Sequence, residues 1–324
     1  MSTAPAFPTT RLTTLQPPTN SPIHALTYSS GTGQFLLTGS ADRQIRLYNP
    51  TSTKRPLIQT YAAHGYEVLD LAVSADNSRF ASVGGDKLVF LWDVSTAQTT
   101  RRFGGHAGRV NAVCFGGEDS GGAGESVVVS GSFDGTVKVW DLRSRSEKAI
   151  VTFAEARDSV SCVRVVGGEI YAGSVDGKVR VYDLALGCVD VDVLGASVTA
   201  VTPAKAGDSY LVSTLDNKLR LMDRTQGKCL QTFEHTGFKN DTYRVRSTLA
   251  MADAYAVSGA ENGKVCVWDV LSGELKEELW HMEGEEAKEA TKKSVVSAVA
   301  WNQMRKQLAS AGGDGTVAVW GVSE

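Results

Sequence analysis

The stretch SGSFDGTVKVWD, which runs from Ser130 to Asp141, contains the pattern that decides the fold. Asp134 and Gly135 form an Asp-Gly pair, and an alternating segment that ends on Trp140 follows them. Because glycine accepts a positive φ, the Asp-Gly pair predicts a tight hairpin turn. The Trp at the end of the segment predicts a large ring buried against a neighbouring sheet.

The same spacing of six residues between a turn residue and a bulky residue occurs seven times in the chain. The bulky positions are Tyr48, Trp92, Trp140, Tyr182, Met222, Trp268 and Trp320. They are separated by 44, 48, 42, 40, 46 and 52 residues. A period of roughly 40–45 residues with several short strands in each unit is typical of a β-propeller blade.

Each repeat contains four segments of alternating hydrophobicity. In the third copy they are RVNAVCF, SVVVSGS, TVKVWD and AIVTF. Alternation with a period of two, interrupted by turn residues, predicts a four-stranded antiparallel sheet. The fold class predicted for the chain is therefore all-β, a seven-bladed propeller over residues 11–324.

The last repeat ends soon after Trp320 and lacks a fourth strand. The segment RLTTL, from Arg11 to Leu15, alternates and precedes the first complete copy. We expect it to complete the last blade and close the ring, after a flexible arm at residues 1–10. A closed ring has no unpaired sheet edge, so we expect a monomer.

Composition narrows the functional classes. The 324 residues include 33 Lys and Arg against 36 Asp and Glu, for a net charge of −3, which argues against strong nucleic-acid binding. Five scattered cysteines without a C-x-x-C pair indicate reduced thiols in an intracellular protein. No secretory signal or long apolar run is present, so we expect a soluble protein without membrane contact.

Two repeats carry a Ser–His–Asp set that also occurs in hydrolases. The two sets, each completed by a Trp, are His64, Ser82, Asp86 and Trp92, and His106, Ser130, Asp134 and Trp140. A nucleophile needs one exposed position, whereas these serines recur inside predicted strands. We therefore interpret the sets as structural hydrogen-bond chains from Trp to Ser to His to Asp, and expect no catalytic residue.

The other repeats match this set less completely. The first has Thr38, Asp42 and Tyr48, with Thr19 at the His position. The fourth and fifth have Ala172 and Val212 at the Ser position, and the seventh has Lys292 at the His position. His24 and His281 fall outside the pattern. We expect these blades to depend more on apolar packing.

No phosphate-loop, dinucleotide or metal-ligand motif is present, so we expect no cofactor and no bound metal. Two segments stand out from the repeats. They are the Gly-rich GGEDSGGAGES, from Gly116 to Ser126, and the charged HMEGEEAKEATKKS, from His281 to Ser294. The charged segment is expected to be a flexible lid or a solvated turn.

The repeats identify the chain as a WD-repeat β-propeller, and further stretches resemble the mitogen-activated protein kinase organizer family. These stretches are HGYEVLD (64–70), GGDKLVFLWDV (84–94), GHAGRVN (105–111), EARDSVS (155–161), AGSVDGKVRVYDL (172–184) and LRLMD (219–223). The resemblance implies a non-enzymatic scaffold in the nucleus and cytoplasm. It implies partners in pre-mRNA splicing, including a helicase with its G-patch activator, or in a mitogen-activated protein kinase cascade.

In such propellers the face that carries the turn Asp residues is the usual docking surface. The candidate partner-binding residues on this face are Tyr66, Glu67, Arg109, Phe133, Arg157, Asp158, Leu215, Phe238 and Glu261. Aromatic residues and arginines are enriched in interface hot spots. We therefore expect Arg109, Arg157 and Phe133 to form the main patch, for an extended peptide segment.

The opposite face is expected to carry the loop DLRSRSEK, with Arg143 and Arg145. Trp140 to Arg143 also matches the short W-D-x-R pattern of cullin-RING ligase substrate receptors, which gives an alternative function. Four residues are a weak motif in a chain that contains several Trp-Asp pairs.

Overall fold

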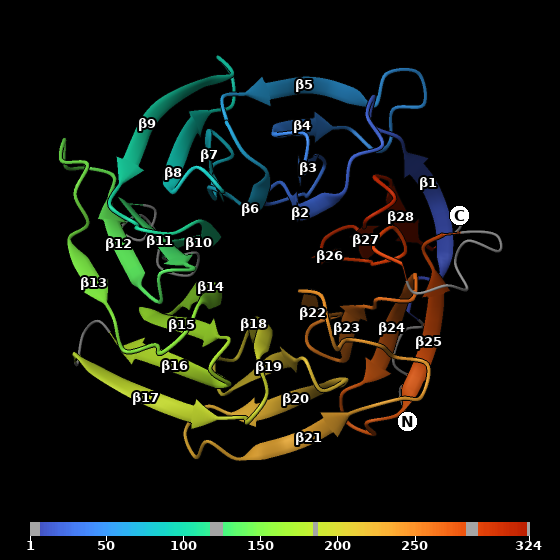
Figure 1. Ribbon diagram of the computed structural model, residues 1–324. Coiled ribbons are helices and arrows are strands. Elements are labelled where there is room, and N and C mark those ends of the chain that lie inside the picture. The colour runs from blue at the N-terminus through green and yellow to red at the C-terminus, as the bar shows by residue number, and fades with distance from the viewer. Residues whose placement is uncertain (1–6, 117–125, 184–186, 283–290, 323–324) are drawn as a thin grey trace.

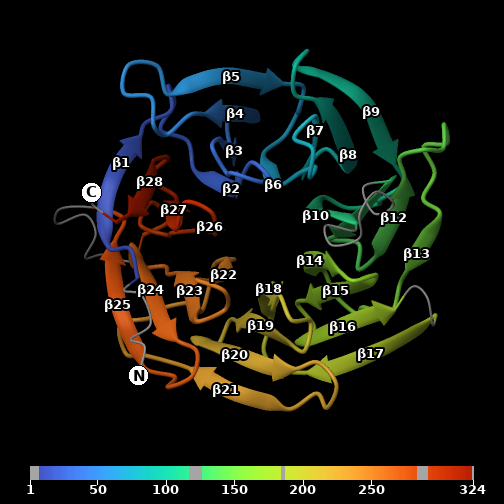
Figure 2. The same ribbon diagram turned by 180° about the vertical axis from the view of Figure 1, so that it is seen from behind.

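The computed structural model describes residues 7–116, 126–183, 187–282 and 291–322. These residues form seven four-stranded antiparallel sheets arranged radially around a central axis (Figure 1). The view from behind shows the same ring, with the first strand beside the last (Figure 2). The predicted seven-bladed propeller is confirmed. Within the described ranges, no helix is long and apolar enough to cross a membrane.

Each blade runs from an inner strand at the axis to an outer strand at the rim. The inner strands are β2 (Ile23–Tyr28), β6 (Val68–Val73), β10 (Val110–Gly116), β14 (Val160–Val166), β18 (Val198–Pro203), β22 (Ser247–Ala250) and β26 (Ala298–Asn302). The second strands are β3 (Leu36–Ser40), β7 (Arg79–Gly84), β11 (Val127–Ser132), β15 (Glu169–Ser174), β19 (Ser209–Thr214), β23 (Tyr255–Gly259) and β27 (Gln307–Ala311). The third strands are β4 (Gln44–Tyr48), β8 (Leu88–Asp93), β12 (Val137–Asp141), β16 (Lys178–Asp183), β20 (Lys218–Asp223), β24 (Lys264–Asp269) and β28 (Val317–Gly321). The outer strands are β5 (Leu57–Ala62), β9 (Gln98–Gly104), β13 (Val151–Phe153), β17 (Cys188–Val193), β21 (Cys229–Phe233), β25 (Leu275–Trp280) and β1 (Thr10–Leu15).

Ring closure joins the two ends of the chain. Strand β1 pairs antiparallel with β28, with Thr10 opposite Gly321 and Leu15 opposite Val317. The N-terminal segment therefore supplies the outer strand of the seventh blade, as predicted, and starts one residue earlier than expected. Every blade then has four strands, and the ring closes between the first and the last segments of the described chain.

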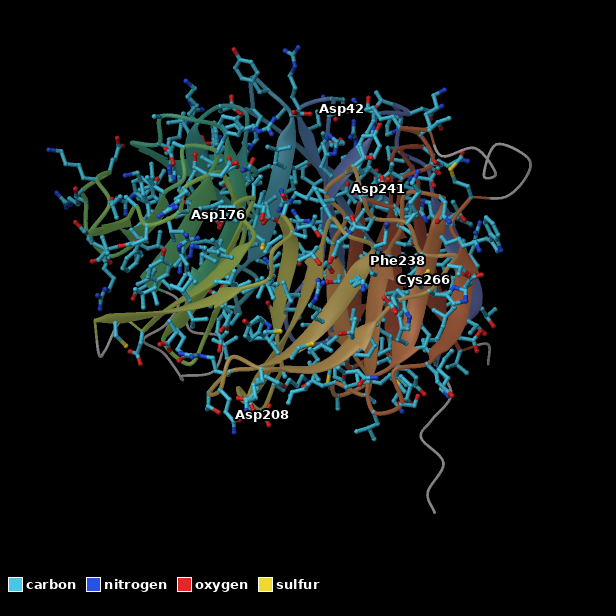
Figure 3. All side chains as sticks on the ribbon, turned by 60° about the horizontal axis from the view of Figure 1, so that its bottom comes forward. Asp42, Asp176, Asp208, Phe238, Asp241 and Cys266 are labelled. Atoms are coloured by element: carbon cyan, nitrogen blue, oxygen red, sulfur yellow. The ribbon has the colours of Figure 1, made fainter. Side chains whose placement is uncertain are left out.

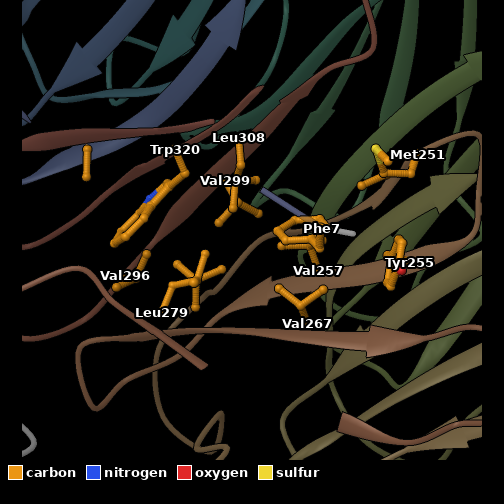
Figure 4. Close-up of a cluster of buried hydrophobic side chains, with 13 residues drawn as sticks. Phe7, Met251, Tyr255, Val257, Val267, Leu279, Val296, Val299, Leu308 and Trp320 are labelled. Atoms are coloured by element: carbon orange, nitrogen blue, oxygen red, sulfur yellow. The ribbon is translucent and has the colours of Figure 1, made fainter. Parts of the chain in front are cut away.

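Phe7 lies in the arm that the sequence analysis treated as flexible, yet it is buried at 7% exposure. Its ring stacks on Trp301 with centroids 5.7 Å apart and meets the edge of Tyr255 at 5.4 Å. Figure 4 shows it between Val257 and Val299, which belong to the sixth and seventh blades. Burying a Phe side chain stabilises a fold by about 2 kcal/mol, so Phe7 helps to close the ring.

The turn after each second strand has the same backbone in all seven blades. Its second central residue has a positive φ, between +62° and +81°. These residues are Arg43, Lys87, Gly135, Gly177, Asn217, Gly263 and Gly315. Glycine adopts this conformation without strain, which explains the Asp-Gly pairs in three of the repeats and the Asn-Gly pair in a fourth.

The bulky residue of each repeat packs between neighbouring blades. Trp140 is fully buried in one cluster with Val83 and Leu91 of the second blade and Val113 of its own blade. All five cysteines lie in the described part of the chain, and none is paired in a disulfide.

Candidate functional site

The second blade contains the complete polar chain that its sequence predicts. Nε1 of Trp92 donates a hydrogen bond of 2.8 Å to Oγ of Ser82. His64 lies 2.7 Å from the same hydroxyl through Nε2, and its Nδ1 lies 2.5 Å from Oδ2 of Asp86. Burial lowers the pKa of His64. Since Ser82 is fully buried, its hydroxyl is out of reach of a substrate.

The third blade repeats this geometry. Trp140 donates to Ser130 at 2.8 Å, and His106 lies 2.8 Å from the same oxygen. Nδ1 of His106 is 3.1 Å from Oδ2 of Asp134. Burial opposes ionisation of Asp134, but hydrogen bonds from Thr136 outweigh it and lower the pKa of Asp134 to about 2. Two buried copies in the same position fit a structural role, because buried polar groups need partners.

A third polar chain lies in the seventh blade, where the sequence analysis was wrong. His281 was placed outside the pattern and Lys292 in the His position. In the structure His281 is buried, with Nδ1 2.8 Å from Oγ of Ser310 and Nε2 3.4 Å from Oδ1 of Asp314. Trp320 donates to Ser310 at 2.9 Å. The segment between His281 and β26 is longer than the segment between the histidine and the inner strand in the second and third blades. The spacing of those blades therefore predicted the histidine position at Lys292 and not at His281.

The first, fourth and fifth blades, which were expected to depend more on apolar packing, also contain an ion pair. Each has an arginine on its third strand, four residues after the turn Asp, that forms an ion pair with it. The pairs are Arg46 with Asp42, Arg180 with Asp176, and Arg220 with Asp216. In the fourth blade Arg180 is 3% exposed. The guanidinium thus fills the place that the imidazole has elsewhere.

The sixth blade uses a phenylalanine in this place. The ring of Phe238 meets that of Trp268 edge to face at 5.1 Å, and Phe238 is 3% exposed. Glu261 is 2% exposed, and its Oε1 accepts hydrogen bonds from three successive backbone amides, at 241–243. Both residues were predicted to bind a partner. That prediction is wrong for them, because both are part of the blade's interior.

The remaining candidates lie on the face that carries the turn Asp residues. In Figure 3 this face is at the upper edge of the ring, where Asp42 lies, and the opposite face is at the lower edge, where Asp208 lies. Tyr66 is 63% exposed and Phe133 is 55% exposed. Arg109, Arg157 and Asp158 are also exposed, whereas Glu67 and Leu215 are half-buried.

Three of these residues belong to one continuous surface, which we call the Phe133 patch: Arg109, Phe133 and Arg157. The guanidinium of Arg109 lies over the Phe133 ring, 5.1 Å from its centroid. The backbone amide of Phe133 donates to the carbonyl of Arg109 at 2.9 Å. The segment that leads to Arg157 lies against the turn that follows Phe133, because a Cβ atom placed on Gly135 would be 3.2 Å from the carbonyl oxygen of Ala156. An exposed Phe held beneath an arginine is a suitable anchor for a partner.

Beside this patch the central channel opens into a cavity of about 290 Å³, which we call the channel mouth. Its lining includes Arg109 and Glu67, which the sequence analysis had named. It also includes residues that the sequence analysis missed as a site: His24, Tyr243, Arg244, Arg246 and Lys292. These come from segments that enter the inner strands of different blades, so no local motif connects them.

The floor of the channel mouth is an ion pair. Nη1 of Arg246 lies 2.6 Å from Oδ1 of Asp70, and its Nη2 donates to the Leu69 carbonyl at 2.8 Å. Burial opposes ionisation of Asp70, yet Arg246 holds the pKa of Asp70 below its ordinary value. The amide of Val113 donates to the other oxygen at 3.0 Å. Asp70 thereby links the second, third and sixth blades at the axis.

The opposite face carries the two other predicted residues. The side chain of Arg143 is 73% exposed, and its Nε lies 3.3 Å from Oδ1 of Asp141. Arg145 is exposed in the same loop. The Gly-rich stretch 117–125 and residues 283–290 of the charged segment lie outside the described residues. His281 and Ser294, the ends of the charged segment, are buried and do not belong to a solvated turn.

Comparison with known proteins agrees with this architecture. Residues 48–277 match a β-propeller family model described as WDR41, and residues 9–49 and 286–321 match the WD domain, G-beta repeat. WD repeat domain-containing protein 83 of Rattus norvegicus is 40% identical over 75% of this chain and 74% of its own. The protein of that name from Xenopus tropicalis is 42% identical over the same shares. Its Dictyostelium discoideum homologue is 25% identical over 90% of this chain and 92% of its own. The chain belongs to the WD-repeat β-propeller family, among the relatives of WD repeat domain-containing protein 83.

Proposed function

We propose that this protein is a non-enzymatic scaffold that docks protein segments on its Phe133 patch. The observation that carries the proposal is the exposed Phe133 ring beneath Arg109, held on a rigid turn at the channel mouth. WD-repeat propellers are typically non-catalytic scaffolds, and the Ser–His–Asp sets in this ring are buried. Binding residues concentrate on loops that a rigid framework positions.

The partners that we propose come from the resemblance described above. They are spliceosomal proteins, namely a helicase with its G-patch activator, and components of a mitogen-activated protein kinase cascade. The protein would act with them in the nucleus and cytoplasm. The overall charge of −3 favours protein partners over direct binding to nucleic acid.

The test is affinity purification of the tagged protein from RNase-treated nuclear and cytoplasmic extracts, followed by mass spectrometry. The variant is Arg109→Glu with Arg157→Glu, and the matched control is Arg143→Glu with Arg145→Glu on the opposite face. Loss of splicing or kinase-cascade proteins in the first variant alone supports the proposal. If both variants retain every partner, docking does not use the Phe133 patch.

A second candidate function is that of a cullin-RING ligase substrate receptor. It is favoured by one observation, the 73% exposure of the Arg143 side chain in the W-D-x-R stretch. Arg143→Ala should then release the ligase adaptor and leave the melting temperature unchanged. Absence of any adaptor among the proteins purified with the unmodified chain would exclude this function.

A further inference from the structure

The channel mouth has an excess of positive charge that the rest of the ring does not share. Four cations line it, Arg109, Arg244, Arg246 and Lys292, with Glu67 among them. The carboxylates of Glu67 and Asp70 balance two of these four positive charges, which leaves an excess of two. The chain as a whole carries −3, so this excess is local. A concave site with one sign of charge concentrates the opposite charge.

Arg244 has unused hydrogen-bonding capacity. Its Nη1 donates to the Asn111 carbonyl at 2.8 Å, while its Nε is buried without a hydrogen-bond partner. In the described part of the chain, no carboxylate forms an ion pair with it, whereas Arg246 beside it is paired with Asp70. Burial and the neighbouring Arg246 lower the pKa of Arg244 to about 10, so it remains charged at neutral pH. Arg244 is half-buried and shares the attraction of Asp70 with Arg246, so its unpartnered Nε carries a cost that an incoming anion would relieve.

The walls of the channel mouth restrict the kind of anion. Pro22, Leu69 and Val295 line it together with the cations, so it offers apolar contact beside charge. An acidic side chain has methylene groups for those walls and a carboxylate for the guanidinium, with which it can form two parallel hydrogen bonds. A nucleic-acid backbone would instead meet a ring that is negative overall.

We propose that the channel mouth binds an aspartate or glutamate side chain from a protein segment that lies across the Phe133 patch. Arg244 receives the carboxylate, and Lys292 at the rim supplies a second charge. The inference rests on the proposed docking function, since it assigns the chemistry of the docked segment.

The test starts with the full-length protein and a random peptide display library. Selected sequences are synthesised with acetylated N-termini and amidated C-termini, and their affinities are measured by fluorescence anisotropy. We expect the selected sequences to share an acidic residue next to apolar ones. Replacing that residue by its amide, Glu→Gln or Asp→Asn, should weaken binding at least about tenfold.

Two protein variants locate the acidic residue. Lys292→Glu should weaken the binding of the selected peptides by a similar factor. Lys293→Glu is the control, because Lys293 is exposed but does not line the channel mouth, and it should weaken their binding much less. Arg244→Gln should abolish the preference for the acid over the amide, provided that its melting temperature shows a folded protein. If Arg244→Gln does not fold, the comparison of Lys292→Glu with Lys293→Glu decides alone.

Several outcomes would overturn the inference. Peptides that bind equally well as amides, or equally well to Lys292→Glu and Lys293→Glu, would place the acid elsewhere. Binding that needs a free C-terminal carboxylate would exclude a side chain. Displacement of the peptides by inorganic phosphate or by oligouridylate at much lower concentration than by glutamate would indicate a phosphate site. Selected peptides that lack acids but are lost in Arg109→Glu with Arg157→Glu would refute this inference and leave the docking function standing.

Discussion

Nη2 of Arg180 lies 2.7 Å from Oδ2 of Asp176, in the place where the second blade has its histidine. The guanidinium also donates to Oγ of Ser174 at 2.8 Å through Nη1. Burial raises the pKa of Asp176, but the hydrogen bonds from Arg180 and Ser174 outweigh burial and bring that pKa to about 2. Six of the blades are thus stabilised by a Trp–Ser–His–Asp chain or by an Arg–Asp pair, and the sixth blade has Phe238 packed on Trp268 instead.

Removing this guanidinium should destabilise the protein strongly. Arg180→Met leaves the Asp176 carboxylate half-buried without its partner, and loss of one member of a buried pair costs about 3–5 kcal/mol. Chemical denaturation should therefore show a large fall in the free energy of unfolding. Lys178→Met on the same strand is the control and should change it by less than about 1 kcal/mol. In a double-mutant cycle, adding Asp176→Asn to Arg180→Met should cost less than the two single changes together; additive costs would mean that the pair is not coupled.

The Arg–Asp pairs show what sequence reasoning could have found. The spacing from Asp42 to Arg46, from Asp176 to Arg180 and from Asp216 to Arg220 is four residues each time. It recurs only in the three repeats that lack a terminal Trp. The repeat pattern predicts a histidine from the segment before the inner strand, and therefore does not predict a cation from the third strand.

Other features followed directly from local patterns. The turn and the strand alternation depend on residues that are near each other in sequence, and both were predicted. The closing strand pairs the two ends of the chain, and it was predicted because the last repeat lacks a fourth strand. Phe133 and Arg109 could also be placed, because their positions in the repeat fix the face. Arg244 and Asp70 could not, since the channel mouth depends on how distant inner strands meet at the axis. Phe238 was misplaced because its connection, residues 234–246, is long and packs onto Trp268, and Glu261 was misplaced because its carboxylate turns inward to backbone amides of that connection.

His281→Ala tests the third polar chain. The change removes the buried hydrogen bond to Ser310 and leaves a cavity, so it should lower the free energy of unfolding by roughly 2 kcal/mol or more. Lys292→Ala, at the position that the sequence had suggested, should leave stability within about 0.5 kcal/mol of the unmodified chain. Thermal and urea denaturation of both variants provide the measurement. Equal stability of the two would remove His281 from the fold's polar chain.

His106→Ala should act on stability and not on binding. The imidazole contacts Ser130, Asp134 and Thr136 inside the third blade, and none of these three residues belongs to the Phe133 patch. We expect a lower melting temperature and, below that temperature, unchanged affinity for the partners or peptides found with the unmodified chain. An unchanged melting temperature combined with loss of an activity would assign His106 a catalytic role instead.

Acidification should weaken the fold before any carboxylate is protonated. A histidine in the unfolded chain has a pKa of about 6.5, and burial holds the pKa of His64 and His106 below that value in the fold. Between the two values the unfolded chain binds more protons, so stability is complete above about pH 6.5 and falls as the pH drops below it.

Melting temperatures across about pH 7.5 to 5.5 measure this effect. The charged groups that act on these histidines are Asp86 and Arg102 for His64, and Asp134 and Lys138 for His106. A variant with both His64→Gln and His106→Gln should be less stable at neutral pH and should show a flatter dependence. If the unmodified protein became more stable on acidification, attraction to Asp86 and Asp134 would outweigh burial.

Lys87→Gly should stabilise the protein, although it removes a side chain. Lys87 is exposed and has a φ of +63°, a conformation that costs a residue with a Cβ atom about 1 kcal/mol or more. Gly135 adopts the same conformation in the next blade without that cost. Glycine also loses more entropy on folding, so the net gain should be roughly 0.5 kcal/mol in the free energy of unfolding. Lys87→Ala keeps the Cβ atom and should give no gain, and Asn217→Gly should gain less, because asparagine tolerates a positive φ. An equal gain from glycine and alanine at position 87 would mean that the lysine charge, and not the backbone of this turn, limits stability.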